Sequence, residues 1–110
     1  MRPLVIRTRQ DPPYIHVELW HRASQKAVGR VSIDPRHYPL WFLTWVGVDE
    51  GFRNQGWATK LLERVERLAR STWGVTHLEL DECLDNPKST LYTRLGYRRI
   101  GIANKMRKPL

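Results

Sequence analysis

The stretch Arg53-Asn54-Gln55-Gly56-Trp57-Ala58 lies between an apolar run, residues 40–48, and a helical pattern, residues 59–70. A strand that leads through a glycine-containing turn into a helix forms an anion-binding site. The first amides of the helix have no partners within it, and the helix dipole is positive at that end. Gly56 allows a phosphate to approach the backbone closely, and Ala58 keeps the next position small. The sequence therefore predicts a phosphorylated ligand bound by backbone amides around residues 53–59.

The spacing of this stretch differs from the common nucleotide motifs, because neither a Walker loop nor a three-glycine dinucleotide fingerprint is present. The pattern Arg-x-x-Gly-x-Ala after a strand instead resembles the coenzyme A pyrophosphate loop of the GNAT superfamily of N-acetyltransferases. A second stretch, Leu91-Tyr92-Thr93-Arg94-Leu95-Gly96-Tyr97, is similar to another signature of that family, and the two occur in the family's order. The resemblance covers residues 40–100 well and the N-terminal third loosely.

Length and composition predict one α/β (α+β) domain spanning residues 1–110. No apolar run reaches the roughly 18 residues of a membrane span, and the N-terminal apolar segment is too short for a signal peptide. Cys83 is the only cysteine, so neither an internal disulfide nor a cysteine zinc site is expected. We therefore expect a cytoplasmic protein with no membrane partner and no metal.

Hydrophobic periodicity predicts a mixed order of strands and helices. The expected strands are residues 4–9, 14–20, 26–33, 40–48, 75–84 and 97–105, with a helix at residues 59–70 and a short helix after Asn86. The resemblance implies a mixed, mostly antiparallel, V-splayed sheet flanked by about two helices. The family usually has one or two helices between its first two strands, but only residues 10–14 separate them here. That absence implies an open acceptor site, a partner subunit that completes the site, or a large acceptor. An exposed sheet edge also makes a homodimer plausible.

The resemblance implies acetyl-CoA as the acyl donor. Amides of residues 55–59 would bind the pyrophosphate with added charge from Arg53, and backbone groups of residues 46–48 would bind the pantetheine arm, with the Val48 amide polarising the thioester carbonyl. Asn86 resembles a pantetheine-contacting Asn of the family, although it lies six residues before Tyr92 where seven is usual, and a helix N-cap explains it equally well. The expected donor-binding residues are Val46, Gly47, Val48, Arg53, Asn54, Gln55, Gly56, Trp57, Ala58, Thr59, Asn86 and Tyr92.

The family places the general acid at the position of Tyr92. A phenol has a pKa of about 10 and is protonated at neutral pH, so it can donate to a departing thiolate. The sequence does not single out one general base that would accept the proton of the acceptor amine. Glu79 and Asp81 lie on one face of a strand near the expected acceptor entrance, and we expect one of them to act as base or as amine anchor. A solvated strand face and a water-relayed proton are the alternatives, and Asp49, Glu50, His37 and His77 also remain open.

The formal net charge of +8 is uneven, since residues 94–110 carry six basic and no acidic groups. We expect an N-acetyltransferase that moves acetyl directly to an amine, either a protein lysine, a protein N-terminus or a small cationic amine. The alternative is a catalytically inactive GNAT-like binding module. It would use the basic C-terminal segment for nucleic acid or an acidic protein, although nucleic acid is the less favoured partner.

Overall fold

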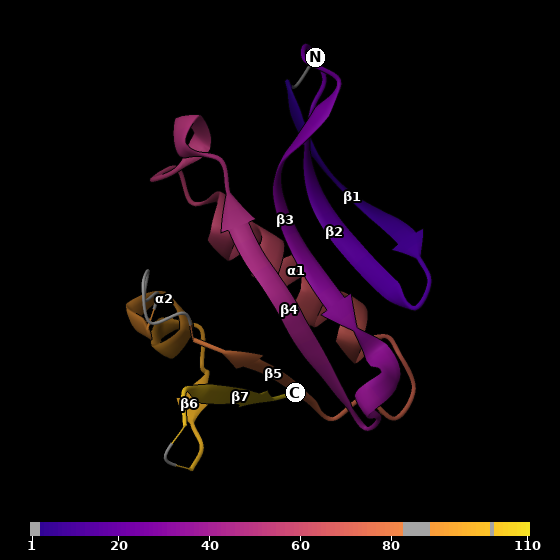
Figure 1. Cartoon of the computed structure of the whole chain (residues 1–110), viewed down its shortest axis with the longest axis vertical. Helices are drawn as coiled ribbons and strands as arrows, with labels where there is room; N and C mark the ends of the chain where they lie inside the picture. The colour runs from indigo at the N-terminus through magenta and orange to yellow at the C-terminus, as the bar shows by residue number, and fades with distance from the viewer. Residues whose placement is uncertain (1–2, 83–88, 102) are drawn as a thin grey trace.

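The computed structural model of the chain describes residues 3–82, 89–101 and 103–110. Within these residues, seven strands form one sheet in the order β1-β2-β3-β4-β5-β7-β6 (Figure 1). The strands are β1 (Leu4–Asp11), β2 (Tyr14–His21), β3 (Lys26–Asp34), β4 (Leu40–Val48), β5 (His77–Asp81), β6 (Arg98–Arg99) and β7 (Lys105–Pro109). The helices of the described residues are α1 (Trp57–Arg70), α2 (Ser89–Arg94) and the short 3-10 helices η1 (Pro35–His37) and η2 (Glu50–Phe52).

The sheet is mixed because β4 and β5 pair in parallel while all other neighbours pair antiparallel. The parallel ladder is short and runs from Leu40 opposite His77 to Leu43 opposite Leu80. Beyond Leu43 the two strands diverge, and Figure 1 shows the resulting V between the β1–β4 half and the β5–β7 part. The expected mixed, mostly antiparallel, splayed sheet with two helices is confirmed.

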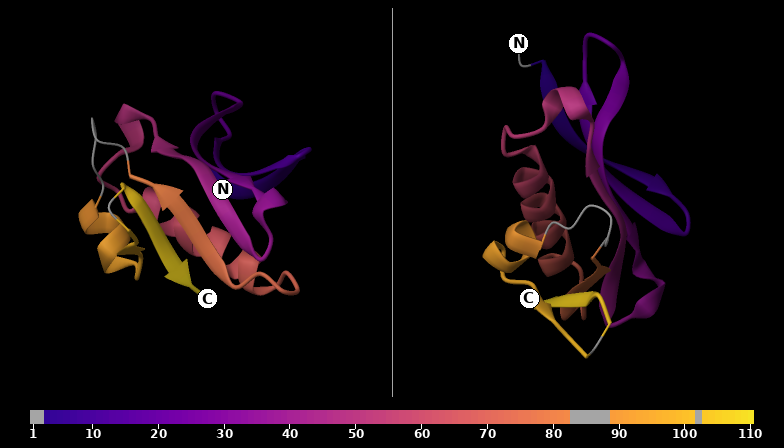
Figure 2. Two further views of the ribbon diagram at one scale, coloured as in Figure 1. Left: turned by 60° about the horizontal axis from the view of Figure 1, so that its bottom comes forward. Right: turned by 60° about the vertical axis from the view of Figure 1, so that its left-hand side comes forward.

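The first three strands form a continuous meander, with β1 and β2 joined directly through Pro12 and Pro13 as the short spacing predicts. α1 crosses behind β3 and β4 in Figure 1, and Figure 2 shows both helices on the same side of the sheet. The opposite face of β1–β3 has no helix over it within the described residues. We call it the open face.

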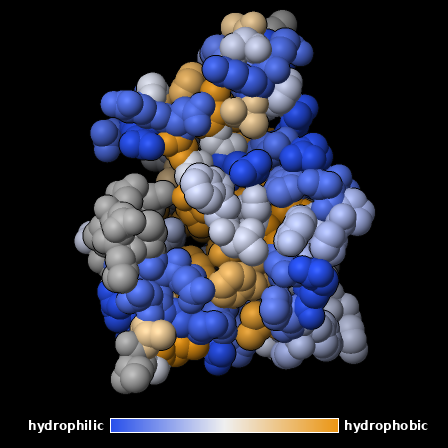
Figure 3. Space-filling view, viewed as in Figure 1, coloured by the Kyte–Doolittle hydropathy of each residue, from blue (hydrophilic) through white to orange (hydrophobic). Residues whose placement is uncertain are grey.

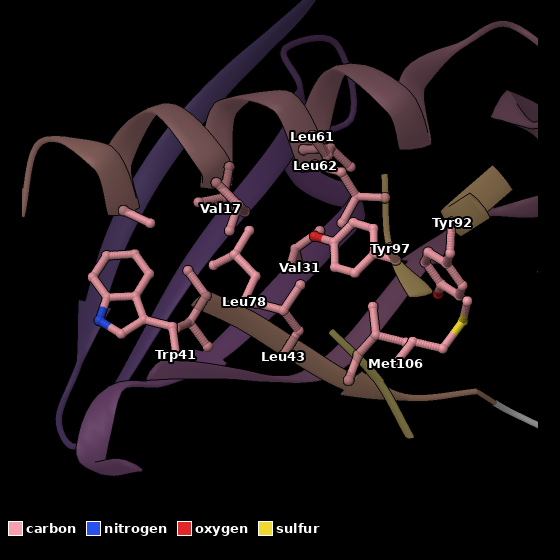
Figure 4. Packing of buried hydrophobic residues seen from close by; sticks show 14 of the residues in the cluster. Val17, Val31, Trp41, Leu43, Leu61, Leu62, Leu78, Tyr92, Tyr97 and Met106 are labelled. Carbon is pink, nitrogen blue, oxygen red and sulfur yellow. The ribbon is translucent and has the colours of Figure 1, made fainter. Parts of the chain in front are cut away.

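The hydrophobic core lies between α1 and the sheet (Figure 4). α1 buries Leu61, Leu62, Val65 and Ala69, which share one face of the helix at the expected spacing. They pack with inward-facing strand residues such as Leu78, which is fully buried. Each such side chain contributes about 1.5–3 kcal/mol through removal of apolar surface from water. This packing holds α1, and therefore the loop that precedes it, against the sheet.

The C-terminal strand differs from the sequence prediction. Residues 97–105 were expected to form one strand, whereas the chain forms β6, turns, and returns as β7 between β5 and β6. Gly101 has φ +66, in the left-handed region that glycine adopts without a steric cost. The prediction of one strand is wrong because this turn reverses the chain within the segment.

Candidate active site

A cavity of about 810 Å³ opens where β4 and β5 diverge. It brings together residues of both sequence motifs, from the end of β4, the loop before α1, the end of β5 and α2. Figure 3 shows hydrophobic side chains at the bottom of a depression bordered by polar ones on the face seen in Figure 1. Of the predicted site residues, those that line the cavity are Val46, Gly47, Val48, Arg53, Asn54, Gly56, Trp57, Ala58, Thr59, Asp81 and Tyr92.

The loop before α1 has the conformation that an anion-binding turn needs. Asn54 and Gly56 have φ of 61 and 82, so the chain turns sharply and enters α1 with Gly56 as N-cap. No side chain caps this end, and the backbone amides of residues 55–59 have no acceptor among the described residues. Five unpaired amides at the positive end of a 14-residue helix fit a pyrophosphate.

Arg53, in the loop before α1, also lines the cavity and is hydrogen-bonded to the end of β4. Its Nε donates to the carbonyl of Val48, 2.9 Å away, which joins the loop to the end of β4. The described residues provide no carboxylate partner for the guanidinium. Its positive charge is therefore available to a bound anion. Gln55, by contrast, does not line the cavity, so only its backbone amide fits the predicted role.

β4 carries a bulge beside the cavity. Ser32 of β3 pairs with Trp45 and Ile33 pairs with Leu43, which leaves Thr44 as an extra residue in β4. A bulge bends the strand and increases its twist. It lies directly after the last residue that pairs with β5, so the bulge and the divergence of the two strands coincide. The backbone of residues 44–48 consequently lines the cavity as an edge along which an extended ligand can lie.

Tyr92 is placed by the short helix α2. It is 5% exposed, lines the cavity, and meets the buried ring of Tyr97 edge-on with 5.7 Å between ring centroids. Figure 4 shows both rings at the end of the core near Met106. Burial, with further contributions from Glu66 and Tyr92, raises the pKa of Tyr97, so this phenol stays protonated. Tyr97 packs in the core, while Tyr92 lies at the boundary between core and cavity.

The two predicted acids of β5 differ in their surroundings. Asp81 is exposed and lines the cavity. Glu79 is buried, lies outside this cavity, and forms ion pairs with Lys105 Nζ at 3.0 Å and Arg107 Nη2 at 2.8 Å. Burial opposes ionisation of Glu79, but hydrogen bonds from Arg107 and Lys105 outweigh it and lower its pKa. Of the two predicted acids of β5, Asp81 therefore lines the cavity and Glu79 does not.

Three carboxylates, Glu66, Glu79 and Glu82, pair with four of the six cations in the basic C-terminal segment. Lys105 and Arg107 are held by Glu79, while Lys108 pairs with Glu66 at 2.7 Å. Arg99 pairs with Glu82 at 2.8 Å. These ion pairs reduce the cationic surface that a polyanion-binding module would require from this segment.

The remaining sequence candidates had different outcomes. Asn86 lies outside the described residues. Asp49 lines the cavity, whereas His37, Glu50 and His77 do not. Sequence reasoning missed Arg30 and Arg94 as cavity residues. Arg94 lies inside the second motif, but Arg30 is brought in only by the pairing of β3 with β4, which no local pattern indicates.

Comparison with protein-family models decides the family. The model described as the acetyltransferase (GNAT) family matches residues 2–97. The chain belongs to the GNAT family. No curated protein sequence matched it.

Solved GNAT structures share the fold. A putative acyl-CoA N-acyltransferase from Klebsiella pneumoniae is 27% identical with a TM-score of 0.76, over 92% of this chain and 77% of that one. An acetyltransferase from Bacillus cereus is 21% identical with a TM-score of 0.75, over 88% and 73%. An N-acetyltransferase from Thermoplasma acidophilum, solved with coenzyme A, is 14% identical with a TM-score of 0.72, over 88% and 61%. In the part of the chain that the structure describes, no helix is long and apolar enough to cross a membrane.

Proposed function

We propose that this GNAT protein transfers an acetyl group from acetyl-CoA directly to an amine. The observation that carries the proposal is the convergence of three groups on one cavity: the unpaired amides at the start of α1, the bulged end of β4 and the Tyr92 side chain. Each corresponds to one requirement of the reaction, namely phosphate binding, thioester orientation and proton donation. The coenzyme A complex of the Thermoplasma relative supports a CoA thioester as donor.

The donor would lie across the mouth of the V. Amides 55–59 and Arg53 would bind the pyrophosphate, and the pantetheine arm would extend along residues 46–48 of β4, where Val48 donates its amide to the thioester carbonyl. Asn54, Trp57, Ala58 and Thr59 complete the walls. Asn86 keeps its sequence-based role as a pantetheine contact or helix cap.

The chemistry requires one bond to form and one to break. The amine nitrogen attacks the thioester carbon, the new C–N bond forms, and the C–S bond breaks as Tyr92 donates a proton to the leaving sulfur. The proton lost by the amine passes to Asp81, directly or through water. Asp81 then releases this proton to solvent, and solvent returns a proton to the Tyr92 phenolate. Asp81 serves as base or amine anchor because it is the strand acid at the cavity. We do not assign this role to Glu79, whose carboxylate is engaged by two cations.

The acceptor class follows from the shape of the site. The open face has no helix over it in the described residues, and an unenclosed cavity favours an acceptor that supplies its own surface, such as a lysine or N-terminus of a protein. A small cationic amine remains the other candidate. A homodimer and a cytoplasmic location stay predictions from the sequence.

The test is the variant Tyr92→Phe. Loss of a general acid lowers kcat by about 10²–10⁴-fold. The affinity for acetyl-CoA, measured by calorimetry, should not change, because the phosphate loop and β4 are untouched. Tyr97→Phe is the matched control, since it removes a neighbouring phenol that packs in the core. Equal kcat values for wild type and Tyr92→Phe would refute the role of Tyr92.

A further inference from the structure

A row of charged residues crosses the open face from β1 to β3. Arg7 pairs with Glu18 across β1 and β2, and Glu18 pairs with Arg30 across β2 and β3. Gly47 of β4 continues the row opposite Arg30. Glu18 is buried and accepts hydrogen bonds from Arg7 Nε at 3.2 Å and from Arg9 Nε at 3.3 Å. Both oxygens of Glu18 therefore accept from the β1 side, and Glu18 forms ion pairs with Arg7 and Arg9 and not with Arg30.

Arg30 is exceptional among the described residues. Of the buried side-chain nitrogen and oxygen atoms in the described residues, Arg30 Nε is the one without a hydrogen-bond partner. No carboxylate among them forms an ion pair with it either. A donor removed from water without an acceptor is costly, and such groups in native proteins commonly bind a ligand, an ion or water. Arg30 also lines the cavity, so the residue lies beside the space that an incoming molecule would occupy.

The surroundings of Arg30 resemble a recognition surface. Trp45 is 57% exposed and lines the same cavity. Its indole Nε1 lies 2.9 Å from the position that a Cβ on Gly47 would take, so the ring covers the glycine that faces Arg30. Asp81 supplies a negative charge elsewhere on the cavity lining. The cavity lining therefore carries a cation, Arg30, and an anion, Asp81, that form no ion pair with the described residues, together with an exposed aromatic ring.

We propose that the acceptor carries a carboxylate as well as its amine, and that Arg30 binds this carboxylate while Asp81 receives the amine. The inference rests on the proposed function and names its acceptor class: an amino acid, or a peptide with an acidic group near the reacting amine. A single guanidinium favours a carboxylate, whose two oxygens match two parallel N–H groups. Arg53, which also lines the cavity without a carboxylate partner, is assigned to the donor phosphates in the proposed function.

Two series of acceptors test the proposal: ω-amino carboxylates of increasing chain length, and n-alkylamines of the same lengths. We expect wild type to prefer one or two lengths of the carboxylate series by about 10–100-fold in kcat/KM, the value of one charge-assisted pair. Arg30→Gln should abolish this preference while leaving kcat/KM for alkylamines unchanged, and Arg30→Lys should restore part of it. Arg22→Gln is the matched control, because this exposed arginine lies outside the cavity and loses the same charge.

The outcomes separate the inference from the function beneath it. Equal rates for both series, or a preference that Arg30→Gln retains, would overturn the carboxylate site while acetyl transfer stands. A loss of acetyl-CoA affinity in Arg30→Gln would also overturn it, by placing Arg30 at the donor. Wild type could bind acetyl-CoA and still acetylate neither series, and the N-acetylated ω-amino carboxylates would then be tested as product inhibitors. Inhibition of wild type that is lost in Arg30→Gln would support the carboxylate site. Absence of inhibition would overturn it. Failure to bind acetyl-CoA at all would instead refute the proposed function.

Discussion

Gly56→Ala perturbs the proposed anion-binding loop at a residue with a left-handed backbone conformation. Gly56 has φ +82 and ψ 8, and a Cβ built on it meets nothing within 4 Å, so the substitution introduces strain without a clash. The left-handed conformation costs about 1–2 kcal/mol for a residue with a Cβ. Reduced freedom of the unfolded chain offsets about 0.4–1 kcal/mol of this cost. The net loss of about 1 kcal/mol should lower Tm by roughly 4–8 °C.

The effect of Gly56→Ala on donor binding should be separate from this strain. The new methyl group enters the cavity lining at the start of α1, where the phosphates would approach the amides. We expect acetyl-CoA affinity, measured by calorimetry, to fall at least about tenfold, equivalent to 1.4 kcal/mol. Gly101→Ala is the matched control, because Gly101 also has a positive φ of 66 and open space, but lies outside the cavity. Equal affinity in the two variants would refute the reasoning.

Further predictions concern the acids of β5 and the turn before it. Asp81→Asn should lower kcat/KM at pH 7 by about 100-fold or more, which is the lower range for loss of a general base. Glu79→Gln should leave kcat/KM unchanged. The reverse pattern would make Glu79, and not Asp81, the base. Glu79→Gln should instead destabilise the fold by about 1–2 kcal/mol at pH 7 in urea unfolding. The lowered pKa of Glu79 makes its stabilisation complete above the unfolded value of 4.5, so the difference should shrink as the pH falls below 4.5 and vanish below the lowered pKa of the folded state. Gly74→Ala should cost about 2–3 kcal/mol in the same assay, because φ is +82 and a Cβ would collide with the Tyr38 ring; a loss below about 0.5 kcal/mol would contradict this.

Local patterns in the sequence were sufficient for most of the fold. The alternation in residues 14–20 and 26–33 predicted the hairpin of β2 and β3, and the spacing of apolar residues predicted the buried face of α1. The glycine turn that leads into α1 was also predictable, because it depends on Gly56 and on the start of a helix, both of which are local features; its role in phosphate binding stays a prediction.

Long-range pairing accounts for what the sequence did not reveal. Glu79 and Asp81 share a strand face, so periodicity alone cannot distinguish them. The distinction comes from β7, whose Arg107 lies opposite Glu79 in the ladder. Since the turn at Gly101 was not expected, neither was the cation that neutralises Glu79. Arg30 was missed for a similar reason, because its lack of a partner depends on the two arginines of β1 that occupy Glu18.

The most direct test of the account is thermal unfolding with and without acetyl-CoA, with ATP and free pantetheine as controls. A ligand at a hundred times its Kd stabilises the folded state by about 2.7 kcal/mol. For a chain of this size, Tm should rise by roughly 10 °C or more. We predict that shift with acetyl-CoA and much smaller shifts with ATP and pantetheine, since the site requires both the phosphates at α1 and the arm along β4. No shift with acetyl-CoA, or an equal shift with ATP, would contradict the assignment of the cavity as an acetyl-CoA site.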